Sequence, residues 1–323
     1  MTAFVPGGWG ASGIAAVVPA RDEEMRLPAA LASLRAGGAD VLVVANGCTD
    51  GTAAVARAHG AAVLEMARQS GGVGAARRAG SDLALSLAPG ASILLATDAD
   101  CRLAPGAMAA LVTALEQADA AMGRVVPDPA EFALLPAAVR RHGDLEDERD
   151  ALLAEIGAFA EPRAFDPMPR HGQCPGALMA FRVSAYRTVG GFAPIPCSED
   201  RDIARRLVLA GLRVAHPWEA VVLASCRLKG RAQGGMAVTI AARTRADLTD
   251  ETRRLERQCV RLRRLAEALR QGGGTALGRL AALVADMPEG GPAASPSAPV
   301  PPTGVWRSPH ALAMKSDPVF VAG

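Results

Sequence analysis

Aromatic residues are scarce in this chain, and it has neither a long uncharged apolar run nor a large excess of charge. Only 3% of its 323 residues are aromatic while 50% are hydrophobic, so Ala, Val and Leu must fill the core. A net charge of +2 offers no electrostatic basis for binding nucleic acid. No apolar run approaches the ~20 residues that a spanning helix needs. We therefore predict no nucleic-acid partner and no transmembrane segment.

Cysteine is also used sparingly. The six cysteines are scattered without a Cys-x-x-Cys pair, so the sequence indicates neither a zinc site nor a redox motif. We expect reduced thiols, as is usual in the cytosol. The first residues, MTAFVPGGWGASG, lack a basic region followed by an apolar core, so no signal peptide is indicated. These features predict a soluble, cytoplasmic protein.

Short apolar runs alternate with helical patterns along the first part of the chain. The runs at 14–18, 41–45, 61–65 and 92–97 are typical of buried strands, and 120–126 suggests one more. This alternation predicts an α/β fold with a mostly parallel sheet covered by helices on both faces. We expect a flexible N-terminus (1–12), a main domain (13–240) with an insertion (127–175), a C-terminal helical region (241–286) and a disordered tail (287–323).

Two aspartates, Asp98 and Asp100, directly follow the apolar run at 92–97. In open α/β sheets the ligand-binding groups lie just beyond the carboxyl ends of the strands, so both carboxylates would reach the rim of a crevice. Hard oxygen ligands of this kind suit Mg²⁺ or Mn²⁺. An Asp-x-Asp pair is weak support by itself, since aspartates that cap a helix have the same spacing.

Acidic residues also begin a predicted helix at 198–209. Ser198 is a plausible N-cap, and Glu199, Asp200 and Asp202 follow in the first turn. They would serve either as functional carboxylates or as simple partners of the helix dipole. A basic loop at 226–235 follows, and arginine side chains are well suited to phosphate oxygens.

Taken in order, several segments resemble the family 2 nucleotide-sugar glycosyltransferases of the GT-A fold. They are VVPARDEE (17–24), ANGCTDGT (45–52), GAARRAG (74–80), TDAD (97–100) and SED (198–200). In that family the first three read like VVPAxNEE, VVDDGSTDGT and GAARNAG. The joint match, over about residues 14–235, is specific although each part is weak. The resemblance implies a GT-A fold and metal-dependent sugar transfer from a nucleoside-diphosphate sugar.

The resemblance also implies roles for single residues. Asp100, with Asp98, would hold Mg²⁺ or Mn²⁺. Asp200 would be the base of an inverting transfer to an acceptor hydroxyl, with Glu199 assisting in the acceptor pocket. The acceptor itself (a small molecule, a glycan or a lipid-linked molecule) is open, and the insertion at 127–175 would select it. The residues implied at the nucleotide sugar are Pro19, Arg21, Glu23, Asn46, Arg77, Asp98, Arg227 and Arg231.

Besides Arg78, which breaks the match to GAARNAG, two departures from the family pattern affect the expected donor site. Asn46 stands where members often place an aspartate against a uridine base, and since an amide both donates and accepts, uracil and guanine stay open. Relatives often supply a late histidine as a third metal ligand, whereas the loop at 226–235 has Arg227, Lys229 and Arg231. Some retaining enzymes share this sheet and metal motif, so retention also stays open.

Other function classes agree less well with the sequence. A non-catalytic sugar-nucleotide-binding protein is one alternative, and a sugar-1-phosphate nucleotidyltransferase is another, although PARDEE lacks the glycine-rich basic loop typical of the latter. A Rossmann dehydrogenase fits poorly because no Gly-x-Gly-x-x-Gly follows the first strand. The Leu/Arg helix at 246–271 is most simply a packing helix, but its arginines would also suit peripheral contact with an anionic membrane.

Overall fold

The computed structural model describes residues 1–271 except residue 69 and residues 231–234. Its described residues form two compact units, each made of two chain segments. Unit 1 comprises Met1–Pro127 and Gln173–Ser225. Unit 2 comprises Asp128–Gly172 and the described residues from Cys226 onward. The first segment of unit 2 nearly coincides with the predicted insertion, whose role in acceptor selection stays a prediction.

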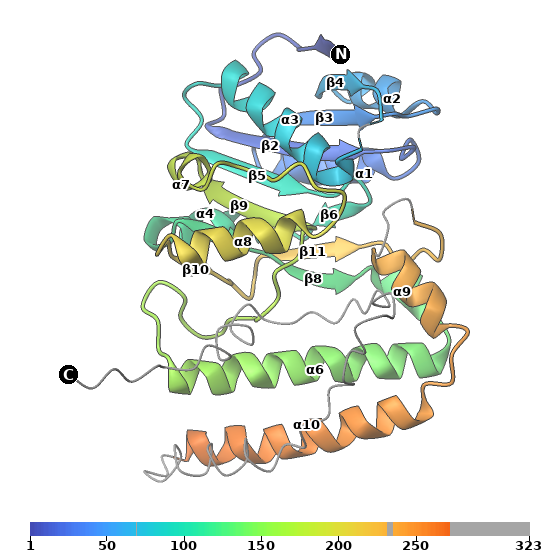
Figure 1. The fold of residues 1–323 in the computed structure, drawn as a ribbon, viewed down its shortest axis with the longest axis vertical. Helices are drawn as coiled ribbons and strands as arrows, with labels where there is room; N and C mark the ends of the chain where they lie inside the picture. Colours follow the sequence, from blue (N-terminus) through green and yellow to red (C-terminus); the bar gives the residue numbers. More distant parts are fainter. Residues whose placement is uncertain (69, 231–234, 272–323) are drawn as a thin grey trace, which may run out of the picture. The chain divides into compact units, whose positions relative to one another are not determined.

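Unit 1 is built on an eight-stranded sheet with the order β1-β4-β3-β2-β5-β9-β7-β10 (Figure 1). Strands β2, β3, β4 and β5 pair in parallel, whereas β9 runs antiparallel to both β5 and β7. This architecture confirms the predicted α/β class with a mostly parallel sheet. The strands are β1 (Thr2–Phe4), β2 (Ile14–Ala20), β3 (Asp40–Asn46), β4 (Ala62–Met66), β5 (Ile93–Thr97), β7 (Ala120–Met122), β9 (Leu178–Arg182) and β10 (Val214–Ala215).

A second, three-stranded sheet consists of β6 (Cys101–Leu103), β11 (Val221–Ala224) and β8 (Arg124–Pro127). The prediction of one strand at 120–126 is wrong, because the chain changes sheet at Gly123. The amide of Gly123 still donates to Leu178 O at 2.9 Å, whereas the amide of Arg124 donates to Ala220 O at 2.8 Å. A Cβ at position 123 would lie 2.4 Å from Leu178 Cδ2, so glycine permits this close passage.

Helices cover both faces of the main sheet, as its burial pattern requires. Val17 and Val18 point to opposite faces of β2, and both are fully buried. Gly80 lets α3 approach the strands, because a Cβ there would lie 2.5 Å from Val44 Cγ2 and 2.6 Å from Val17 Cγ1. The helices of unit 1 are α1 (Leu27–Ala36), α2 (Thr52–Ala58), α3 (Gly72–Leu87), α4 (Ala107–Gln117), α7 (Val183–Thr188) and α8 (Glu199–Leu209).

The N-terminus departs from expectation. We expected residues 1–12 to be loose, but Thr2–Phe4 form β1, which pairs antiparallel with β4. The Arg57 guanidinium lies 5.9 Å from the centre of the Phe4 ring and also pairs with Glu65 on β4. The short strand therefore covers the edge that β4 would otherwise expose.

Unit 2 is helical, and α6 and α10 run side by side in it (Figure 1). Within the predicted insertion, residues 129–133 and 137–160 form two helices, which Pro136 separates. The predicted C-terminal helix is present as α10, whereas α9 was not predicted. None of the helices in the described residues has the length and apolar composition needed to cross a membrane. The helices are α5 (Pro129–Ala133), α6 (Ala137–Ala160), α9 (Met236–Arg243) and α10 (Thr249–Arg270).

Candidate active site

A buried arginine joins the two acidic motifs of unit 1. Arg77 on α3 is 1% exposed, and its Nη2 donates to Asp98 Oδ1 at 2.6 Å while its Nη1 donates to Glu199 Oε1 at 2.8 Å. Nη2 also donates to Gly176 O at 2.5 Å. Asp98 directly follows β5, Glu199 begins α8, and Gly176 precedes β9. A single guanidinium therefore brings together three segments that lie far apart in the sequence.

Asp200 is held beside this cluster by backbone amides. Its Oδ2 accepts from the amide of Gly176 and its Oδ1 from the amide of Arg201, each at 2.8 Å. Gly176 fits between two site residues, because a Cβ there would lie 2.8 Å from Arg77 Nη1 and 3.1 Å from Asp200 Oδ2. Ser198 occupies the predicted N-cap position with a left-handed φ of 63°, but its side chain makes no capping hydrogen bond.

The glycine-rich start of α3 supports the segment that leads into α8. The amide of Gly74 donates to Ile195 O at 3.2 Å. A Cβ at Gly74 would lie 2.4 Å from both Ala193 O and Ile195 O, and one at Gly71 would lie 2.5 Å from Pro194 O. These glycines therefore allow backbone-to-backbone packing, which sets where Glu199 and Asp200 begin their helix.

The charged side chains of this cluster shift one another's pKa values. Burial raises the pKa of Glu199, and the positive charge of Arg77 opposes this shift. Burial lowers the pKa of Arg77, but the charges of Asp98, Glu199 and Asp200 outweigh it and the net shift is upward. Arg77 therefore stays a cation, and it balances carboxylates that would otherwise repel one another.

The end of β5 has the donor set of a cation site. Asp98, Asp100 and Cys101 offer ligand atoms that lie within 4.8 Å of one another. Burial, followed by the charges of both aspartates, raises the pKa of the Cys101 thiol well above its usual value. A neutral thiol is a poor ligand for a hard cation. The carboxylates of Asp98 and Asp100 are thus the groups that fit Mg²⁺ or Mn²⁺.

Hydrogen bonds connect the loops that follow β2 and β3. Asp22 Oδ1 accepts from the Thr49 amide at 2.7 Å, and the Glu23 amide donates to Thr52 Oγ1 at 2.8 Å. Asn46, the last residue of β3, donates from Nδ2 to Gly72 O at 3.3 Å. The strand order reverses between β2 and β5, which is where open α/β sheets bind their ligands.

The predicted nucleotide-sugar residues have different positions. Pro19 lies near the end of β2 and Asn46 is the last residue of β3, whereas Arg21 and Glu23 lie in the loop that follows β2 at the same end of the sheet. Arg77 was expected to face the diphosphate, but its side chain is buried beneath the acidic motifs. Arg227 belongs to unit 2 and Arg231 lies outside the described residues, so the roles of these two arginines stay predictions.

Sequence reasoning missed several residues at this end of the sheet. Thr97 Oγ1 donates to Ala177 O at 2.6 Å, which ties the end of β5 to the start of β9. Gly176 contacts both Arg77 and Asp200 through its backbone. Asp22, Cys48 and Asp50 form a second group of close ligand atoms, and the acidic loops were the only signal for it.

Comparison with known families shows which family this chain belongs to. The family model described as Glycosyl transferase family 2 matches residues 15–188. This match spans more than half of the chain, so the chain belongs to glycosyl transferase family 2. Family membership and the mostly parallel sheet together confirm the predicted GT-A fold class.

Curated relatives share only part of their length with the chain. Uncharacterized glycosyltransferases of Mycobacterium bovis and Mycobacterium tuberculosis are 40% identical over 115 residues. The matched region is 35% of this chain and 49% of each relative. The chain thus spans about half the length of the curated relatives it matches.

Solved structures with a similar fold include two glycosyltransferases. The mannosyltransferase PcManGT from Pyrobaculum calidifontis, in complex with GDP-Man and Mn²⁺, is 17% identical with a TM-score of 0.42, covering 87% of this chain and 80% of that one. Glucosyl-3-phosphoglycerate synthase from Mycobacterium tuberculosis, in complex with Mn²⁺, UDP and phosphoglyceric acid, is 21% identical with a TM-score of 0.43, covering 73% and 81%. Likeness at this level supports no statement about the ligands of this chain.

Proposed function

We propose that this chain transfers a sugar from a nucleoside-diphosphate sugar to an acceptor hydroxyl, with a divalent cation and with inversion. The proposal rests mainly on one observation: Arg77 joins the Asp98 motif to Glu199, and Asp200 lies beside this junction. In a displacement, the groups that bind the leaving group must lie close to the base. Here both the Asp98 motif and Asp200 supply carboxylates. Membership of family 2 supports the same reaction class.

Asp98 and Asp100 would hold the Mg²⁺ or Mn²⁺. When bound, the cation would stabilise the negative charge that builds on the diphosphate leaving group. Arg77 binds Asp98 through one oxygen, which leaves the second oxygen of that carboxylate for the cation. Because Arg77 is buried, we propose that it positions Asp98 and Glu199 rather than contacting the donor. Asn46 would meet the nucleotide base, with uracil and guanine as the candidates.

Asp200 is the proposed general base. Each of its oxygens accepts one backbone N–H, and a carboxylate has about four acceptor positions, so it retains capacity for the proton of an acceptor hydroxyl. The two amides also fix the orientation of the carboxylate. Glu199 is buried and paired with Arg77, so we propose that it holds the start of α8 in place instead of taking a proton.

Thermal unfolding with ligands tests the donor site. We would melt the full chain with UDP, GDP, CDP or ADP, each with Mn²⁺, Mg²⁺ or EDTA. We expect one diphosphate to stabilise the protein only with metal, by roughly 2.7 kcal/mol at 100 times its Kd. Asp100→Asn should abolish this shift. Asp82→Asn is the control, since Asp82 is an exposed partner of Arg78 and should leave the shift unchanged.

Turnover measurements test the base. Asp200→Asn should keep the metal-dependent shift but lower sugar transfer or donor hydrolysis by roughly 10²–10⁴-fold. Inversion would appear as an opposite anomeric configuration in the product. A stabilising diphosphate without any turnover would favour the non-catalytic sugar-nucleotide-binding protein. Pyrophosphate release from a nucleoside triphosphate and a sugar-1-phosphate would favour the nucleotidyltransferase. If no diphosphate shifts the melt, the Asp98/Asp100 assignment fails.

A further inference from the structure

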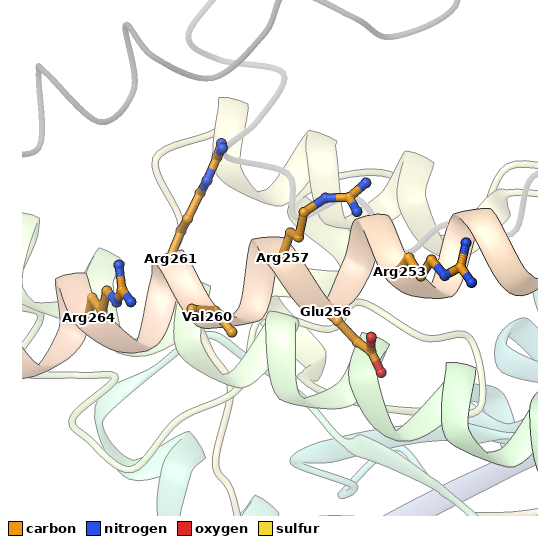
Figure 2. A pocket seen from close by; sticks show the side chains of 6 residues that line it. All are labelled: Arg253, Glu256, Arg257, Val260, Arg261 and Arg264. Atoms are coloured by element: carbon orange, nitrogen blue, oxygen red, sulfur yellow. The ribbon is translucent and has the colours of Figure 1, made fainter.

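A row of arginines lies on the outer side of α10. Arg253, Arg257, Arg261 and Arg264 follow one another at helical spacing and line a shallow hollow together with Glu256 and Val260 (Figure 2). All four arginines are exposed. Figure 2 shows Arg257 and Arg261 extending away from α6, whereas Glu256 points toward it. We call these four residues the α10 arginine face.

The opposite side of α10 is already occupied. Leu255, Cys259 and Leu265 are buried there, and they pack against apolar residues of α6. The helix therefore has no free apolar side that would insert into another structure. Whatever binds the outer side of α10 would meet charged groups first.

The arginines beside α6 are neutralised by glutamates, whereas in the α10 arginine face only Arg253 has an acidic partner among the described residues, Asp250 at 3.7 Å. Arg263 pairs with Glu148, and Arg270 pairs with Glu155 through two hydrogen bonds of 2.6 and 2.7 Å. By contrast, Arg257, Arg261 and Arg264 make no hydrogen bond or ion pair within the described part of the chain. Unpaired guanidinium groups in a row create a local positive field that attracts anions.

The chemistry of the face indicates phosphate. Helix α10 carries seven arginines and no lysine against four acidic residues. Guanidinium groups bind phosphate oxygens through paired N–H donors, which an ammonium group does not match. The four arginines of the face extend over roughly 16 Å at 1.5 Å per residue, so they match an array of phosphates better than a single ion.

We propose that the α10 arginine face docks on an anionic phospholipid surface. A straight, exposed row is complementary to a plane of headgroups, and Val260, 41% exposed within the row, would contact the interface. The nearly balanced net charge of +2 disfavours a nucleic-acid partner for the whole chain. This proposal concerns unit 2 alone and does not rest on the catalytic proposal.

Vesicle sedimentation of the full chain tests the docking. Phosphatidylcholine vesicles with about 30% phosphatidylglycerol would be compared with pure phosphatidylcholine, in 50 mM and 300 mM NaCl. We expect binding only to the anionic vesicles, and weaker binding at the higher salt because the Debye length is only about 10 Å even at 0.1 M. If the chain bound neutral and anionic vesicles equally strongly, the proposal would be overturned. The absence of binding at low salt would overturn it as well.

Matched double variants locate the contact. Arg257→Gln with Arg261→Gln should weaken vesicle binding roughly 25-fold, since each basic residue near the surface contributes roughly five-fold. Arg187→Gln with Arg205→Gln changes the net charge equally on other exposed helices and should stay within about two-fold of the unchanged chain. Arg257→Lys with Arg261→Lys should keep most of the binding. The proposal is wrong if both glutamine pairs weaken vesicle binding equally. It is also wrong if the unchanged chain binds DNA fragments but not vesicles, and the α10 glutamine pair abolishes that DNA binding.

Discussion

Two adjacent arginines of one motif have opposite environments. The Arg77 side chain is 1% exposed and pairs with Asp98 and Glu199, whereas the Arg78 side chain is 42% exposed and pairs with Asp82 one turn along α3. Surface pairs of the second kind contribute little to stability. A buried pair is different, because loss of one partner leaves an uncompensated charge in the interior.

This contrast predicts unequal effects of the same substitution. Arg77→Met should lower the free energy of unfolding by about 3–5 kcal/mol, because Glu199 would be left buried without its partner. Arg78→Met should change it by about 1 kcal/mol or less. Urea unfolding of both variants measures the difference.

A second substitution separates charge from packing. Adding Glu199→Gln to Arg77→Met removes the orphaned carboxylate, so the double variant should unfold at higher urea than Arg77→Met alone. If the two losses simply add, the Arg77–Glu199 pair does not hold the motifs together. Asp98→Asn in the Arg77→Met background should restore less stability than Glu199→Gln does, because Asp98 is half-buried and water can solvate it.

The sequence singled out Arg77, Asp98 and Glu199, but not the contacts between them. A single buried guanidinium joins the two carboxylates, while the roles of these residues stay predictions. No local pattern indicates which of two neighbouring arginines is buried, since both occur on the same helix with apolar neighbours. Gly176 was not singled out either, because its importance comes from contacts with residues distant in sequence.

At the scale of elements, α6 and α10 pair with a regular register. The ion pairs Arg141–Glu256, Glu148–Arg263 and Glu155–Arg270 each join residues 115 positions apart. A constant separation means that the helices run parallel, and a repeat of seven residues is typical of coiled-coil packing. The Leu/Arg pattern at 246–271 predicted the helix α10, but only the long-range register identifies α6 as its partner.

A buried histidine between these helices predicts pH-dependent stability. His142 on α6 is buried, and its Nδ1 lies 3.0 Å from Thr252 Oγ1 on α10. Burial lowers the pKa of His142 from 6.5, despite an opposing effect of Glu146. The unfolded chain then binds the proton more tightly than the folded one, so acid favours unfolding. Other charged groups near the ring are Arg243, Glu251 and Arg149.

The lowered pKa of His142 sets the expected dependence of stability on pH. Stability should rise with pH from the lowered pKa of folded His142 up to about 6.5, and the His142→Gln variant should lack this part of the rise. Urea unfolding at intervals between pH 5 and 8 measures it. His59→Gln, at an exposed histidine of unit 1, is the control and should keep the full rise. An unchanged slope in His142→Gln would show that other groups carry the dependence.

At the scale of the whole molecule, the chain passes between two units at residues 127–128, 172–173 and 225–226. Each unit has hydrophobic clusters of its own, in the main sheet and its helices for unit 1 and along α6 and α10 for unit 2. The alternation of strands and helices predicted the parallel strands β2, β3, β4 and β5 of unit 1, but not β1. It did not predict that the insertion groups with the C-terminal helices, because that grouping depends on side chains 115 positions apart.

Separate cores predict that a donor nucleotide would protect only part of the chain. The residues proposed to hold the diphosphate and the metal lie in β2, β3, β5 and their loops, so ligand binding should make opening of these elements less favourable. We expect amide exchange in β2, β3 and β5 to slow up to roughly 100-fold at 100 times the Kd, while exchange in α6 and α10 stays unchanged. Hydrogen exchange read by mass spectrometry, with and without the stabilising diphosphate and metal, measures both regions at once.

The Asp100→Asn variant should lose the protection in β2, β3 and β5. Equal slowing in α10 would instead mean that the two units open together, and that the ligand stabilises the chain as one cooperative body.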